Sequence, residues 1–305
     1  MWLLLAFMSA ALLGCYDSFK KQALKSNAVI PVLFLNTLFS SIIFLPFIIL
    51  SASTDVLDGS IFHVASGGWE VHKYVVLKAL IVLSSWVLGY FGMKHLPLTI
   101  VGPINATRPV LVLIGALLVF GERLNGLQWI GVLLAVLSFL MLSRSGKKEG
   151  IDFKHDHWIW MIVGAAMLGA ISGLYDKFLM VPVESGGVGL DRMLVQSWYN
   201  IYQCGMMLAM LLLLWWPKHN ETTPFHWHWS IIGVSVFLST ADFMYFYSLS
   251  LPDAMISIVS MIRRGSVIVS FLFGAAFFHE KNLKAKAFDL ALVLLGMIFL
   301  YIGSK

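Results

Sequence analysis

The chain has 305 residues, of which 59% are hydrophobic and 12% are charged, against about 45–50% and about 25% in a soluble domain. This composition excludes a soluble globular protein and indicates a chain that folds in a lipid bilayer. The net charge of +5 comes mostly from lysines outside the apolar segments, so it predicts contact with membrane surfaces and no nucleic-acid partner.

Ten apolar segments follow one another along the chain, and their lengths suit helices that cross a hydrocarbon layer of about 30 Å. Such continuous runs favour helices over a β-barrel, whose strands alternate in polarity. We therefore predict an all-α integral membrane protein with ten transmembrane helices. We expect it in a cell membrane, namely the inner membrane of a bacterium. The expected spans are residues 2–19, 30–50, 74–93, 97–120, 126–142, 158–179, 194–216, 229–249, 254–278 and 287–302.

Two motifs occur once in each half of the chain, in the same order. "LLGCYDSF" in the first span resembles "ISGLYDKF" in the sixth, which pairs Asp17 with Asp176. "LSSWVLGYFGMKHLP" in the third span resembles "LSTADFMYFYSLSLP" in the eighth, which pairs Tyr90 with Tyr245. The chain is therefore expected to contain a duplicated unit of five helices.

The expected units are residues 1–146 and 157–305, joined by a basic linker at 147–156. Because five is an odd number, consecutive units in one membrane must have opposite orientations. Inverted repeats of this kind are typical of secondary transporters, whose substrate site lies near the midplane where the repeats meet.

The two repeats resemble the EamA type of the drug/metabolite transporter superfamily. The similarity rests on the paired spans and on "LPLTIVGPINATRPVLVLIGALLVFGERLNGLQWIGVLL" and "HEKNLKAKAFDLALVLLG". It implies a transporter of metabolites such as amino acids, sugars, nucleotide sugars or drugs. It also implies a central cavity lined by the third, fourth, eighth and ninth helices with the first and sixth. Glu122 and Glu280 match the end motif of the family, as caps or gates.

Arg263 and Arg264 lie in the middle of the ninth span, and Arg108 occupies the equivalent point of the fourth. Apolar residues of the ninth span favour insertion by about 4 to 7 kcal/mol in sum, whereas two central arginines oppose it by about 5 to 7 kcal/mol. Arginines at this depth cannot reach the membrane surface, so we expect them to face protein or water.

These arginines have two interpretations. A guanidinium group binds carboxylate or phosphate through two parallel hydrogen bonds, which indicates an anion-binding cavity. Alternatively, the arginines form buried ion pairs with Asp242, Asp17 or Asp176. Asp242 could also pair with Arg264 or take a coupling proton.

Asp17 and Asp176 lie near the ends of their spans and precede lysines, so they form either interfacial ion pairs or the mouth of the cavity, where they would act in gating or coupling. Further candidates for lining the substrate cavity are Lys78, Tyr90, Tyr245, Asn36 and Asn200.

The sequence predicts a transporter of a small anionic or zwitterionic metabolite that works by alternating access. Alternatives are a membrane enzyme acting on a lipid-linked substrate, which would need an interfacial acid or histidine cluster, and a passive channel. No nucleotide-binding loop is present. We expect a monomer without metal or cofactor, and a proton or ion that couples to the transport of the substrate.

The orientation in the membrane stays open. Loops after odd-numbered spans carry twelve lysines and arginines, and the other side carries five. The positive-inside rule then places both termini outside, whereas the family resemblance implies that both termini are inside.

Overall fold

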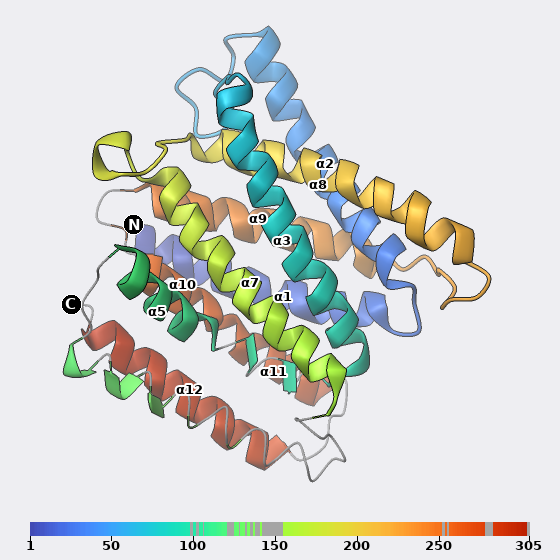
Figure 1. Cartoon of the computed structure of the whole chain (residues 1–305), viewed down its shortest axis with the longest axis vertical. Helices are drawn as coiled ribbons and strands as arrows, with labels where there is room; N and C mark the ends of the chain where they lie inside the picture. The colour runs from blue at the N-terminus through green and yellow to red at the C-terminus, as the bar shows by residue number, and fades with distance from the viewer. Residues whose placement is uncertain are drawn as a thin grey trace.

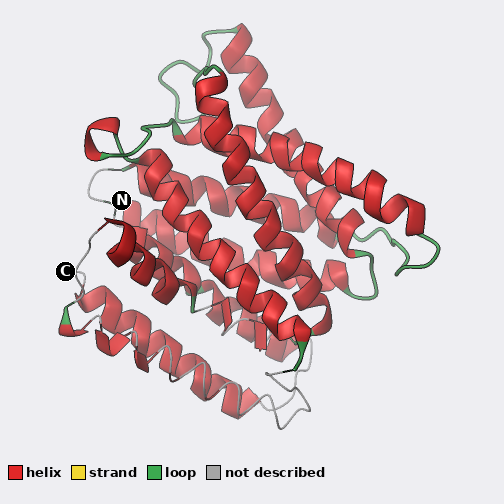
Figure 2. Ribbon diagram, in the orientation of Figure 1, coloured by secondary structure: helices red, strands yellow, loops and turns green. Residues whose placement is uncertain are grey.

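The computed structural model describes residues 1–97, 100–101, 104–105, 107–120, 125–127, 129–131, 133–134, 137, 141, 155–251, 254, 256–277 and 283–303. Within this part Figure 2 shows helices and loops and no strand. The α-helices are α1 (Trp2–Leu24), α2 (Val29–Ser53), α3 (Trp69–His95), α5 (Arg108–Phe120), α7 (His157–Met180), α8 (Arg192–Met210), α9 (Ser230–Ser250), α10 (Ile256–Arg264), α11 (Ser266–Phe277) and α12 (Leu283–Gly303).

Local sequence sets where several helices begin. Asp156 precedes α7, and its carboxylate accepts a hydrogen bond from the backbone nitrogen of Trp158 at 2.9 Å. Asp191 caps α8 in the same way, with Leu194 as the donor at 2.8 Å. Such caps satisfy backbone groups that have no partner inside the helix.

Six helices of the described part are long and apolar enough to cross a membrane. They are Trp2–Leu24, Val29–Ser53, Trp69–His95, His157–Met180, Arg192–Lys218 and Ser230–Ser250. In the fifth of these, α8 passes into a π-helical turn, Leu211–Trp215, and a 3-10 turn, Trp216–Lys218. The all-helical prediction is confirmed, and these six segments correspond to the first three and to the sixth, seventh and eighth expected spans.

The ninth expected span is interrupted, which corrects the prediction of one continuous helix. It consists of α10 and α11, with Gly265 between them. The backbone nitrogen of Gly265 donates to Ile262 O at 2.9 Å, a bond to the third residue back instead of the fourth. The fourth span is also interrupted, because Thr107 forms a turn before α5. Pro109 therefore lies in the first turn of α5, where proline is tolerated, instead of bending a longer helix.

Four predicted features lie wholly or mainly outside the described residues. Glu122 and Glu280 are among them, and of the linker at 147–156 only residues 155 and 156 are described. The fifth span is described only in fragments between residues 126 and 141.

The two halves of the chain interlock. Helix α1 packs most extensively on α9, α3 packs on α7, and α2 packs on α8, so each principal contact joins one half to the other. Figure 1 shows these pairs side by side through the centre of the molecule, with α12 at its lower edge. Close crossings depend on glycine: a Cβ on Gly14 of α1 would lie 2.6 Å from Val269 Cγ1 of α11. A larger residue at this position would therefore push α1 away from α11.

Candidate functional site: a charged central cavity

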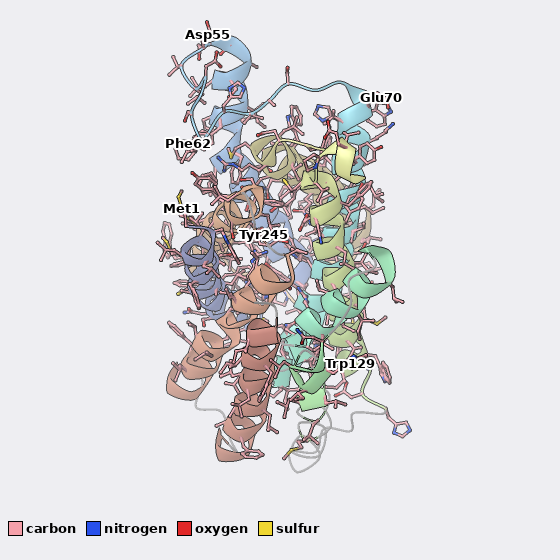
Figure 3. The ribbon with its side chains drawn as sticks, turned by 90° about the vertical axis from the view of Figure 1, so that its left-hand side faces the viewer. Met1, Asp55, Phe62, Glu70, Trp129 and Tyr245 are labelled. Carbon is pink, nitrogen blue, oxygen red and sulfur yellow. The ribbon has the colours of Figure 1, made fainter. Side chains whose placement is uncertain are left out.

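A cavity of about 150 Å³ lies where the interlocked helices meet. Helices α1, α3, α5, α7, α9, α10 and α11 contribute to its wall, together with Tyr199 of α8 and Asn105 of the fourth span. Tyr245, which lines the cavity, lies in the interior in Figure 3, away from the end that carries Asp55 and Glu70. The volume exceeds that of several water molecules, so the cavity can hold a small ligand.

Asp242 of α9 and Arg263 of α10 form an ion pair in the cavity wall. Tyr199 Oη donates to the second carboxylate oxygen of Asp242 at 2.8 Å. The guanidinium carbon of Arg263 lies 4.1 Å from the centre of the Tyr245 ring, within cation–π range. The structure thus pairs Asp242 with Arg263. The side chain of Arg264 lies outside the described residues.

Lys78 of α3 and Asp176 of α7 form a second ion pair, and both side chains are only 4% exposed. Lys78 Nζ also donates to Ser172 Oγ at 2.6 Å, and Tyr245 Oη donates to Asp176 Oδ2 at 3.1 Å. Asp176 therefore lies deep in the protein, which corrects its interpretation as a residue of an interfacial ion pair. Its partner Lys78 belongs to the other half of the chain.

Asp17 and Lys20 of α1 form a third pair at 2.9 Å, and both residues line the cavity. Lys20 Nζ lies 4.3 Å from the ring centre of Tyr16 and 5.2 Å from that of Tyr90. Asp17 also accepts a hydrogen bond from Ser270 Oγ at 3.3 Å. The ammonium group is thus held between one carboxylate and two aromatic faces.

Arg108 differs from the other three cations of the cavity because no described residue forms an ion pair with it. Its Nη2 donates to the backbone oxygen of Ala165 at 3.2 Å, and its Nε is buried without a described acceptor. The described charged residues of the wall are the cations Lys20, Lys78, Arg108 and Arg263 and the carboxylates Asp17, Asp176 and Asp242. This wall therefore carries an excess of one positive charge, which belongs to Arg108.

Two predicted lining residues lie elsewhere. Asn36 of α2 donates to Tyr90 Oη at 3.2 Å, and Asn200 of α8 donates to Gln196 O at 2.8 Å. Both are buried between helices instead of in the cavity wall, which corrects their expected place. Tyr90, Tyr245 and Lys78 do line the cavity.

Sequence reasoning missed several wall residues. Tyr199 is the neighbour of Asn200 and faces the cavity one residue earlier on α8. Ser172 lies inside the second Tyr-Asp motif, but a small serine in a helix does not by itself indicate a cavity. Lys20 directly follows the first motif, where a lysine is expected at the membrane surface. Gly169 carries no functional group at all, and its role depends on contacts that only the fold reveals.

Gly169 of α7 makes room for the guanidinium of Arg108. A Cβ at this position would lie 2.8 Å from Arg108 Nε, and closer still to Cζ. We expect Gly169→Ala to stabilise an Arg108→Ala protein by about 1 kcal/mol, because alanine favours a helix, but to stabilise the wild type less or not at all, because Cβ displaces the guanidinium.

Melting temperatures of the four proteins of this double-mutant cycle measure the coupling. Gly164→Ala is the matched control on the same helix, since its Cβ would meet only Leu88 Cδ1, at 3.3 Å. An equal effect of Gly169→Ala in both backgrounds would show that Gly169 does not position Arg108.

A helical chain with six candidate spans around a charged interior cavity is a multi-pass membrane protein. Residues 1–144 match the family model described as the EamA-like transporter family. The resemblance stated from the sequence is thereby confirmed over these residues, which make up slightly less than half of the chain.

The fold is shared with solved structures, of which 27 chains match. One of them, described as "Crystal structure of protein", has a TM-score of 0.67 and 12% sequence identity, over 97% of this chain and 94% of that chain. At this identity the similarity concerns the fold alone. No curated protein matches the chain.

Proposed function

We propose that the protein is a secondary transporter that moves a small anionic or zwitterionic metabolite through the central cavity by alternating access. The family match supports transport. The observation that carries the substrate class is Arg108, the one cation of the described cavity wall without a described carboxylate partner.

The charge of Arg108 needs a counter-charge. An uncompensated buried cation is costly, since burial removes the hydration of the guanidinium without replacing it. A carboxylate or phosphate in the cavity would supply that counter-charge and two parallel hydrogen bonds. The three other cations already have acidic partners. Binding of a ligand with one negative charge would therefore bring the net charge of the described wall plus ligand to zero.

The ten-helix inverted repeat is part of the same proposal. Three pairs of residues from the two repeats line one cavity: Asp17 and Asp176, Tyr90 and Tyr245, and Arg108 and Arg263. The fourth and ninth spans are both interrupted close to their arginine. Interrupted helices at a repeat interface are typical of substrate sites in secondary transporters, and they supply backbone that can change conformation during alternating access.

The purified protein in detergent should identify its substrate class in a thermal-shift screen. Amino acids, organic acids and sugar phosphates are the test set, and neutral sugars and alkyl amines of similar size are the controls. We expect only members with a carboxylate or phosphate to raise the melting temperature, because they alone neutralise Arg108. Stabilisation by neutral sugars or amines alone would contradict the proposed substrate class.

A counterflow assay in proteoliposomes then separates a transporter from a channel. We expect vesicles preloaded with an unlabelled hit to accumulate the labelled hit transiently, because an alternating-access carrier exchanges ligand across the membrane. A channel gives no such overshoot. Flux without counterflow or saturation would favour the passive channel over this proposal.

A further inference from the structure

We propose that Asp17, Tyr16 and Tyr90 form a binding subsite for a primary ammonium group, which Lys20 fills while no ligand is bound. The inference rests on the proposed transport function and narrows its substrate class to a zwitterion. The ligand would place its ammonium group against Asp17 and its carboxylate against Arg108.

The contacts around Lys20 are those that select an ammonium group. The Lys20 side chain is 9% exposed, and its Nζ lies 2.9 Å from Asp17 Oδ1. Two tyrosine rings lie within cation–π distance of the same nitrogen, at 4.3 Å and 5.2 Å. The Tyr16 hydroxyl donates to that of Tyr90 at 3.3 Å, so the two rings are fixed relative to each other. All four side chains line the cavity that holds Arg108.

Exchange of Lys20 for a ligand would conserve the charge of the site. The Asp17 side chain is only 21% exposed, so loss of its cation would destabilise the protein, because a partly buried carboxylate is left without a counter-charge. If an incoming ammonium group takes the place of Lys20, Asp17 keeps a cation and the aromatic faces keep their cation–π contact. The number of buried ion pairs stays the same, so the exchange avoids a large electrostatic barrier.

The position of Lys20 provides an exit for its side chain. Lys20 lies five residues before Lys25, the exposed residue that follows α1, or about 7.5 Å along the helix axis. A lysine side chain is flexible and can extend to the membrane surface. The neighbouring Lys21 already reaches the end of α3, where it donates to Met93 O and Leu96 O at 2.7 Å each.

Chemical rescue tests the subsite without knowledge of the transported substrate. Lys20→Ala leaves the Asp17 site empty, and propylammonium chloride is the probe for it. We expect the probe to raise the melting temperature of Lys20→Ala saturably, by several degrees, because it restores the missing cation. Propanol and sodium chloride at the same concentrations should not do so. The wild type and Lys25→Ala should not respond, since Lys20 fills the site in both.

The double variant Lys20→Ala/Asp17→Asn distinguishes the carboxylate from non-specific binding, and we expect it to lose the response. If Lys20→Ala does not fold, Lys20→Ser decides in the same way, because its short, uncharged side chain also leaves Asp17 without a cation. No response of the single variants, or an equal response of the double variant, would overturn the subsite. The thermal-shift screen is independent of this outcome, so a carboxylate ligand of Arg108 could still be found if the ammonium subsite failed.

Discussion

Replacement of Lys78 by methionine is expected to lower the free energy of unfolding by about 3–5 kcal/mol, the usual cost of breaking a buried ion pair. Lys78 and Asp176 are each 4% exposed, so the variant leaves a carboxylate in the protein interior, where Tyr245 Oη is its remaining hydrogen-bond donor among the described residues. The pair also joins α3 to α7, and its loss weakens a contact between the two halves. Reversible unfolding in mixed detergent micelles measures the effect.

Two further variants make this result specific. Lys78→Met/Asp176→Leu removes both charges, and we expect it to recover most of the lost stability, because a buried pair exchanged for apolar residues is often neutral or stabilising. Lys73→Met removes a lysine of the same helix that forms an exposed pair with Glu70, and such pairs contribute about 0–1 kcal/mol. Similar losses at Lys73 and Lys78 would show that the buried pair does not stabilise the fold.

Replacement of Arg108 by glutamine is expected to abolish measurable binding of the carboxylate ligands found in the screen, with an affinity loss of about 30-fold or more. The variant loses the positive charge that has no described acidic partner, so its melting temperature should change little or rise. Arg108→Lys should restore binding only in part, because an ammonium group lacks the planar fork of the guanidinium. Ligand titration by thermal shift or calorimetry measures both quantities.

Arg263→Gln is the matched comparison, because Arg263 lines the same cavity but pairs with Asp242. We expect this variant to be destabilised, since the Asp242 carboxylate loses its cation. The proposal predicts opposite patterns for the two arginines: lost binding with a stable fold for Arg108, and lost stability for Arg263. Loss of stability at Arg108 with unchanged affinity in the folded fraction would place Arg108 among the structural residues.

The membrane-spanning helices could be predicted from sequence because length and apolar composition determine them locally. The interruption at Gly265 could not be predicted in this way, because one long helix and two consecutive short helices have the same hydropathy. The difference lies in the backbone hydrogen bond from Gly265 to Ile262, and that bond depends on how α10 and α11 pack against α1.

The charged candidates could be predicted by a different argument. Insertion energy requires a central arginine to face inward, and this argument applies to Arg108 and Arg263 alike. It does not determine the partner of each group, because the partners come from helices far apart in sequence, such as Asp176 for Lys78. The argument does not extend to neutral polar residues such as Asn36 and Asn200. The hydrogen bonds of an amide can be made equally by a neighbouring helix and by a ligand, so the sequence does not distinguish the two.

The interlocked halves have a consequence for biosynthesis. The main neighbours of α1, α2 and α3 are α9, α8 and α7, so these first helices leave the ribosome long before their partners are translated. Contacts of such large sequence separation form slowly. Lys78 has no acidic partner in α7 until Asp176 has been translated. During that interval the nascent chain exposes a charge and helix surfaces that are buried in the folded protein, and these favour binding by a membrane insertase or chaperone. Ribosomes stalled after α3 should therefore carry a nascent chain that is sensitive to protease, and protection should arise only when α9 has been inserted.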